Sequence, residues 1–472
     1  MCKFFYVIKF YIKKLLINVI IRLGDRMKTT ILIIYNRLIT LVCKIFKRNG
    51  SVFPGSLVKK HDLNILKKVK YPKYVIGITG SSGKGSTTSL IAHILEKSGY
   101  KVVWNNSGSN LVNAATTLIL NNANPFTKKI NADVLLMELD ESYISKIFDK
   151  NRLTHMLITN ITRDQPARNG HPELILDKIV NSIGDNTHVI INADDPFLNR
   201  LKYLHHGMIT TYGVGKTKYD TETPINNSVD AAYCPICGKK LKYDFYHNGH
   251  IGKYKCDYCD FGREKVNFEA NDVDLKKQFF TINNSIYHIN KDVFFAVYYT
   301  LAAYTLCKTI GISDENLKKY LNDEPAYSKR MKNLKICDRT VHMIESKNEN
   351  NLSYYEALHY INEQHHKKTI ILGFDNVSRR YKLNDLSWLY DVQFELLNDK
   401  YIDKIFVIGR FRFDVLTRLN YANISEDKLI LIDNLDTLLE RVKNESSGDI
   451  YTMVCFDMTD IIRKKIKEET HE

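Results

Sequence analysis

The sequence predicts an α/β protein built on a doubly wound parallel sheet, and three observations support this prediction. Short apolar runs that suit buried strands alternate with stretches of helical pattern along most of the chain. Several of these runs end in acidic or polar residues, and ligands bind at that edge of open parallel sheets. One run, at residues 74–79, leads into a glycine-rich turn and then into a helical pattern. We therefore expect a phosphate-binding site at the carboxyl edge of the sheet.

Length and charge leave several classes of partner open. The chain has 472 residues, more than one hydrophobic core usually organises, so we expect two or three domains. Hydrophobic residues make up 44% and charged residues 26%, which are ordinary values for a folded protein. The net charge of +15 would suit a nucleic acid, an anionic membrane surface or a polyanionic metabolite.

The first 48 residues are apolar and basic. The stretch 4–23 is interrupted by Lys9, Lys13, Lys14 and Arg22, so it lacks the roughly 18 uncharged residues of a spanning helix. No small-residue cleavage site follows it, which disfavours a signal peptide. We expect peripheral contact of residues 1–48 with the inner face of the cell membrane. Two alternatives stay open: a helix packed on the protein, or residues ahead of a start at Met27.

A glycine loop carries the phosphate-binding prediction. Its glycines let backbone N–H groups approach phosphate oxygens, the following helix contributes a positive dipole, and Lys84 can reach terminal phosphates. The spacing departs from the strict P-loop, and Gly85 follows the lysine where a hydroxyl is usual, so Ser86 or Thr87 must supply any Mg²⁺ ligand. The expected nucleotide-binding residues are Gly80, Ser81, Ser82, Gly83, Lys84, Gly85, Ser86 and Thr87.

Four of the nine cysteines form two close pairs. Cys234 and Cys237 are separated from Cys256 and Cys259 by eighteen residues, which matches a four-thiolate zinc ribbon. Such a site has no open position, so we expect the Zn²⁺ to be structural. Cysteines that bind a metal must stay reduced, so we expect a cytoplasmic compartment. A ribbon of this kind can also bind nucleic acid, but here it interrupts a nucleotide-binding domain, so we expect no nucleic-acid partner.

Together, these motifs resemble the Mur ligase superfamily from about residue 50 to the C-terminus, and in particular its MurT family. The resemblance implies a basic hydrophobic arm (1–50), a central ATP-binding domain (51–325) with an inserted ribbon (216–266), and a C-terminal domain (326–472). Roles carried over from the family place Lys84 on the β- and γ-phosphates and Glu138 on Mg²⁺. They place Asn160, Asp164 and Gln165 on the neighbouring metal and substrate groups.

In the C-terminal third, the resemblance is partly broken and partly diagnostic. Ala296 and Tyr299 occupy positions where the family has asparagines near adenine, and Arg330 is the candidate nucleotide-contacting arginine or an ordinary linker residue. Residues 384–395 resemble the D-x-S-W-x-x-D-x-x-F-E signature of MurT. There Asp385, with Asp391 as second choice, would complete a Cys-His-Asp triad with a GatD-like glutaminase subunit. Alternatively, either aspartate caps a helix.

The implied reaction is an ATP-dependent ligation of a carboxylate and an amine. The D-glutamate α-carboxyl of the lipid II stem peptide would be activated as an acyl phosphate and amidated to D-isoglutamine. The ammonia would come from a separate glutaminase, because no cysteine here lies in a glycine-flanked strand-turn-helix elbow. Two alternatives remain: an amino-acid-adding ligase of murein or archaeal pseudomurein, and a zinc-ribbon ATPase that binds nucleic acid.

Overall fold

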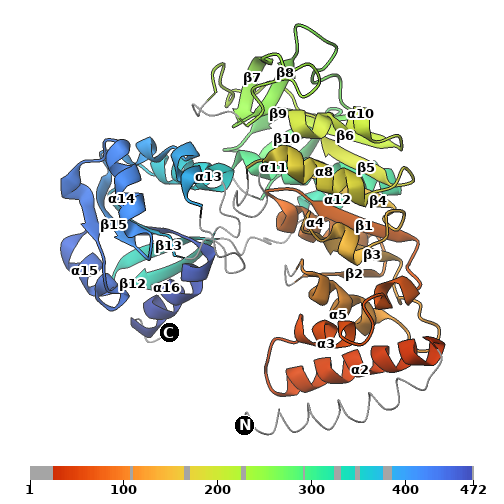
Figure 1. Cartoon of the computed structure of the whole chain (residues 1–472). Coiled ribbons are helices and arrows are strands. Elements are labelled where there is room, and N and C mark those ends of the chain that lie inside the picture. Colours follow the sequence, from red (N-terminus) through yellow and green to blue (C-terminus); the bar gives the residue numbers. More distant parts are fainter. Residues whose placement is uncertain are drawn as a thin grey trace.

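The computed structural model describes residues 25–106, 110–163, 171–224, 230–290, 293–323, 331–345, 351–375 and 385–469. It has two α/β bodies, each with its own sheet and core (Figure 1). The larger body carries the glycine loop, and the smaller one is formed by the C-terminal third (Figure 1).

A nine-stranded sheet organises the larger body, in the order β11-β10-β9-β6-β5-β4-β1-β3-β2. The strands from β2 to β9 in this order pair in parallel, whereas β10 and β11 are antiparallel. Its strands are β1 (Tyr74–Thr79), β2 (Val102–Trp104), β3 (Val134–Glu138), β4 (His155–Ile158), β5 (His188–Asn192), β6 (Ile209–Val214), β9 (Phe268–Asp274), β10 (Phe279–Ile282) and β11 (Ser285–His288). The parallel α/β prediction is confirmed.

Helices cover both faces of this sheet, so its central strands are apolar on both sides. Ile76 and Ile78 share a core with α4 and α11, while Val75 shares the opposite core with α5 and α8. The helical segments of this body are α2 (Asp25–Ile45), α3 (Phe53–Lys59), η1 (Ile65–Lys68), α4 (Lys84–Lys97), α5 (Val112–Asn122), α6 (Ile144–Ile147), α8 (Pro172–Ser182), α9 (Pro196–Asn199), α10 (Leu201–Leu204), α11 (Phe294–Ile310) and α12 (Asp314–Asn322).

Helix α2 packs on the protein along one face. Leu32 and Ile33 are fully buried, and the Asn36 amide donates to the Thr117 carbonyl of α5 at 3.1 Å. Residues 25–45 therefore form a helix packed on the larger body, which is one of the alternatives left open by the sequence. Among the described helices, none is both long and apolar enough to cross a membrane.

The cysteine segment forms a small unit that lies above β9 and β6 in the view of Figure 1. Its hairpin consists of β7 (Lys242–Asn248) and β8 (Ile251–Lys255), which pair antiparallel. A few buried residues, including Leu241, Tyr254 and Phe261, form its own small core beside the cysteines.

A six-stranded sheet organises the C-terminal body, in the order β12-β13-β17-β14-β15-β16. Only β12 is antiparallel to its neighbour; the β12–β13 hairpin was not predicted from the sequence. The elements are β12 (Met331–Ile336), β13 (Arg339–Glu345), α13 (Asn351–Asn362), β14 (Lys368–Gly373), η2 (Ser387–Asp391), η3 (Phe394–Leu397), β15 (Ile402–Ile408), α14 (Arg412–Tyr421), η4 (Glu426–Lys428), β16 (Leu429–Leu431), η5 (Leu435–Thr437), α15 (Leu438–Glu445), β17 (Asp449–Val454) and α16 (Phe456–Glu469).

Candidate active site

The glycine loop joins the end of β1 to the start of α4, and two of its glycines have left-handed backbone. Gly80 has φ +129° and Gly83 has φ +84°, a region that side-chain-bearing residues rarely adopt. A Cβ atom on Gly80 would lie 2.2 Å from the Thr159 hydroxyl, and one on Gly83 would lie 2.5 Å from the Phe295 ring. Both positions therefore require glycine, and the loop backbone stays open at the N-terminus of α4, where anions bind.

Lys84 is buried beside a carboxylate that the sequence analysis did not select. Its Nζ donates to the Gly80 carbonyl and lies 3.4 Å from Glu141 Oε1. The same Glu141 oxygen accepts the Gly80 N–H and the Thr79 hydroxyl, each at 3.0 Å. Glu141 therefore holds both ends of the loop. It belongs to the acidic run after β3, but only its contacts distinguish it from Glu138 and Asp140.

The two hydroxyl candidates for Mg²⁺ differ in their surroundings. The Thr87 hydroxyl is fully buried and donates to the Gly83 carbonyl at 3.0 Å, a bond inside the helix. Ser86 is partly exposed at the start of α4. The geometry thus favours Ser86 as the residue that could reach a metal ion.

Adjacent strands bring the other candidates to the loop. Asn160 follows β4, and its side chain accepts the Ser82 N–H at 3.0 Å and donates to the Ser82 carbonyl at 3.1 Å. Glu138 ends β3, and the Asn105 amide brackets its backbone with bonds of 2.8 and 2.9 Å. Because β3, β1 and β4 are neighbours in a parallel sheet, their carboxyl ends place Glu138, Lys84 and Asn160 along one edge.

Arg163 links this edge to the C-terminal body. Its guanidinium contacts Asp391 Oδ2 at 2.8 Å and Asp230 Oδ1 at 3.6 Å. Asp230 is almost completely buried and also accepts the Thr162 hydroxyl at 2.5 Å. Nothing in the sequence spacing joins these residues, so sequence reasoning missed Arg163 and Asp230.

The segment that resembles the MurT signature is held by its aromatic and basic neighbours. Trp388 is buried against the rings of Tyr354 and Phe374. The buried Arg418 donates to the Leu389 carbonyl at 3.1 Å, the Val392 carbonyl at 2.7 Å and Glu395 at 3.0 Å. These contacts fix η2 and η3; Asp391 is the last residue of η2, and Asp385 lies two residues before η2 begins.

Asp385 and Asp391 have different contacts within this segment. The Asp385 carboxylate accepts the Ser387 N–H at 2.9 Å, a local capping bond, and is partly exposed. The Asp391 carboxylate is bound by Arg163, and only 14% of its side chain is exposed. The Asp391 carboxylate is thus held by a cation, whereas the Asp385 carboxylate accepts a local backbone bond.

Three candidates lie outside the described residues: Asp164, Gln165 and Arg330. The two altered positions in α11 are inward-facing. Ala296 is fully buried, and the Tyr299 hydroxyl donates to Asn290.

The four ribbon cysteines come together. Sγ atoms lie 3.6 Å apart for Cys234 and Cys259 and 3.4 Å apart for Cys237 and Cys256, and all four fall within 4.8 Å of one another. Four sulfur atoms at 2.3 Å from a tetrahedral Zn²⁺ would be about 3.8 Å apart, so the donor set fits that ion. The Lys239 backbone N–H lowers the pKa of Cys237 to about 7, whereas burial raises the pKa of Cys234 above its ordinary value.

A buried ion pair anchors the ribbon to the sheet. Arg263 Nε lies 2.8 Å from Asp194 Oδ1, and this carboxylate also accepts the Val214 N–H and the Tyr298 hydroxyl. Burial opposes the charge on Arg263, but Asp194 and Glu269 outweigh it and hold the pKa of Arg263 above its ordinary value. Asp194, the first of the two aspartates after β5, therefore has a structural role here.

Comparisons with known proteins agree with this arrangement. Residues 78–257 match the Mur ligase middle domain family, and residues 347–458 match the MurT ligase C-terminal family. The chain is 28% identical over 380 residues to the lipid II isoglutaminyl synthase subunit MurT of Staphylococcus aureus (strain COL), covering 80% of this chain and 84% of that protein. It is 24% identical to the MurT subunit of Streptococcus pneumoniae (strain ATCC BAA-255 / R6), covering 86% and 90%.

A solved structure shares the fold. A pseudomurein peptide ligase type C from Methanothermus fervidus superimposes with a TM-score of 0.62 at 20% identity, covering 88% of this chain and 83% of that one. These matches support a Mur ligase, a class of enzymes that use ATP and Mg²⁺. Within them it is a MurT-like ligase, an ATP-dependent enzyme of cell-wall synthesis.

Proposed function

We propose that this enzyme amidates the D-glutamate α-carboxyl of a lipid-linked muropeptide, with ammonia supplied by a separate GatD-like glutaminase subunit. The curated relatives carry the name of a glutamine-hydrolysing lipid II isoglutaminyl synthase subunit. The observation that carries the proposal is the pairing of a complete phosphate loop with a MurT-type C-terminal segment in one chain.

The loop residues suit activation of a carboxylate. Lys84 and the N–H groups at the start of α4 would bind the phosphates of ATP, and Mg²⁺ would neutralise charge during transfer. Ser86 and Glu138 are the residues that would hold this ion. Lys84 contacts the Gly80 carbonyl and Glu141, and its ammonium group would turn toward phosphate when ATP binds.

The described cysteines support a separate source of ammonia. Cys43, Cys307 and Cys455 are buried, and burial raises the pKa of the Cys307 thiol well above its ordinary value. Cys337 is exposed in the turn between β12 and β13, and the others belong to the ribbon. Cys455 lies at the junction of β17 and α16, but it is fully buried and has no flanking glycine, so it lacks the exposed, glycine-flanked elbow of a glutaminase nucleophile. Because the Asp391 carboxylate is bound by Arg163, Asp385 would be the residue that orients the histidine of the partner.

We assign the ribbon cysteines to a structural Zn²⁺. The proposal rests on the spacing of their sulfur atoms and on the small size of the core around them. With few apolar residues to bury, the ribbon depends on the ion for its fold.

The test separates the ligase from the glutaminase. The purified enzyme with its co-purified partner is assayed for amidation of lipid-linked muropeptide, with either glutamine or ammonium chloride as nitrogen donor. Asp385→Asn should abolish the glutamine-dependent reaction and keep the ammonium-dependent one, because its role lies in the partner's triad. Lys84→Ala should abolish both.

Asp391→Asn is the matched control for Asp385→Asn, since it removes one charge from the same segment. Loss of only glutamine-dependent turnover in Asp391→Asn, with Asp385→Asn unaffected, would exchange the two assignments. Turnover by the single chain with a free amino acid instead of ammonia would overturn the proposal in favour of an amino-acid-adding ligase.

A further inference from the structure

Helix α2 has a second apolar face that is exposed to solvent. Met27, Leu38, Leu41 and Ile45 are each more than half exposed, and Ile34 is 39% exposed. Their spacing of seven, four, three and four residues places them in one stripe along the helix, opposite the face that carries Leu32 and Asn36. Exposed apolar surface arranged in a continuous stripe is typical of an interaction site.

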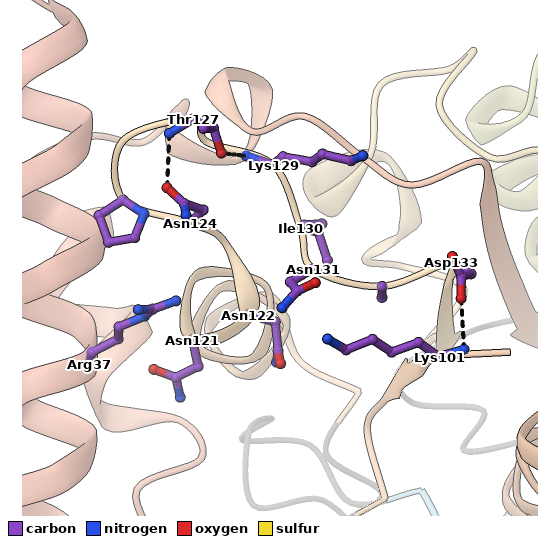
Figure 2. A pocket seen from close by; sticks show the side chains of 12 residues that line it. Arg37, Lys101, Asn121, Asn122, Asn124, Thr127, Lys129, Ile130, Asn131 and Asp133 are labelled. Carbon is purple, nitrogen blue, oxygen red and sulfur yellow. Dashed lines mark hydrogen bonds between the residues drawn. The ribbon is translucent and has the colours of Figure 1, made fainter.

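A cation-lined cleft adjoins this stripe. The cleft has a volume of about 640 Å³ and is lined by α2, the end of α5 and the segment before β3 (Figure 2). Arg37 and Lys101 reach into it from opposite sides (Figure 2). Asp133 is the one acidic lining residue, and its carboxylate accepts the Lys101 backbone N–H at 2.9 Å. Neither Lys101 nor Lys129, also on the lining, forms an ion pair with a described residue.

The charge of the neighbouring sequence identifies the occupant. Residues 27–48, which lie in α2 and the turn after it, contain five Lys and Arg and no Asp or Glu, a net charge of +5. A face that combines apolar side chains with this excess of cations is complementary to an anionic bilayer, where acyl chains meet phosphate headgroups. A protein partner would have to match the apolar stripe and the basic surroundings together.

We propose that the exposed stripe of α2 and the adjoining cleft form a docking surface for an anionic lipid bilayer. The stripe contacts the acyl region, and Arg37 and Lys101 bind lipid phosphate. The surface lies at the amino-terminal ends of β2 and β3, whereas the glycine loop lies at the carboxyl ends. Lipid contact therefore leaves the nucleotide site free. The inference rests on the proposed function in one respect, that a lipid-linked substrate gives the contact its purpose.

Vesicle co-sedimentation of the full chain tests this proposal. We expect binding to vesicles with phosphatidylglycerol, weak binding to pure phosphatidylcholine, and release by salt. Leu38→Gln with Leu41→Gln should weaken binding by about tenfold or more, since each loses a partly buried leucine contact. Leu174→Gln with Met208→Gln, which changes exposed apolar residues elsewhere, should leave binding unchanged.

A charge-matched pair isolates the cleft. Lys101→Gln should weaken binding about fivefold, the effect expected for one cation at an anionic surface. Lys240→Gln removes the same charge from the distant ribbon and should have little effect. Equal effects of the two variants, or equal binding to both kinds of vesicle, would overturn the proposal. The proposal would also be overturned if sedimentation velocity showed a dimer that dissociates in the Leu38→Gln, Leu41→Gln variant and in no other variant.

The assay contains no nucleotide and requires no turnover. Failure of vesicle binding with intact glutamine-dependent amidation removes only this inference. Intact vesicle binding without amidation removes only the proposed reaction.

Discussion

Replacing Gly83 with alanine would perturb the phosphate loop in two ways at once. The residue has φ +84°, and left-handed backbone costs a side-chain-bearing residue about 1–2 kcal/mol. The new Cβ would also lie 2.5 Å from the Phe295 ring, closer than carbon atoms tolerate. Overpacking of this kind costs about 1–3 kcal/mol. The loop or the ring must therefore move, and the total cost is about 2–5 kcal/mol.

Gly99 provides a control with the same backbone strain and no overlap. Its φ is +87°, it lies just after α4, and a Cβ there would meet no atom within 4 Å. Gly99→Ala should lower the free energy of unfolding by about 1–2 kcal/mol and leave ATP affinity unchanged. Gly83→Ala should destabilise more and weaken ATP binding by about tenfold or more, because about 1.4 kcal/mol of displaced loop contacts is a factor of ten.

Both quantities can be measured directly. Isothermal titration calorimetry with a non-hydrolysable ATP analogue gives the affinity, and chemical denaturation gives the stability. Gly83→Ala combined with Phe295→Ala removes the overlap but keeps the strain, so it should regain part of the affinity. Affinity for the analogue equal to wild type in Gly83→Ala would refute the reasoning.

Three further outcomes are expected. Arg263→Met should lower the free energy of unfolding by about 3–5 kcal/mol, because it leaves Asp194 charged and buried; adding Asp194→Asn should restore part of the loss in urea denaturation. Burial lowers the pKa of His155 to about 4, and the neighbouring His188 adds to this effect. The neutral imidazole therefore contributes stability that is fully present above pH 6.5. This contribution is lost as the pH falls from 6.5 to 4. The loss is about 3 kcal/mol, and His155→Gln should flatten the pH profile of stability. Cys237→Ser should abolish zinc in elemental analysis and raise hydrogen exchange in residues 230–266, with β1 and α4 unaffected.

Each of these has a contrary result. An Arg263→Met, Asp194→Asn double variant no more stable than Arg263→Met would show that the lost charge balance is not the cause. If the stability of His155→Gln fell between pH 6.5 and 4 as much as that of wild type, other groups would be responsible for the pH dependence. Wild-type protein purified without zinc, yet with a protected ribbon, would refute the metal assignment.

The sequence by itself determined the architecture of the sheet and the place of the nucleotide. The apolar runs at 74–79, 188–192 and 369–373 are strands because buried parallel strands are apolar on both faces, a pattern visible in any single segment. The glycine loop was equally readable, because strand, glycine turn and helix are consecutive in the chain. The paired cysteines, too, carry their spacing within one short segment.

The tertiary structure alone decided which side chains meet. Glu141 contacts the glycine loop, and Arg163 contacts both Asp230 and Asp391, the latter 228 positions from Arg163 in the sequence. The β12–β13 hairpin and the exposed stripe of α2 also emerged only there. Local periodicity reports which residues are apolar, but it does not report which of two apolar faces a helix buries. Ion pairs between distant segments depend on the tertiary arrangement of those segments, which no local sequence pattern specifies.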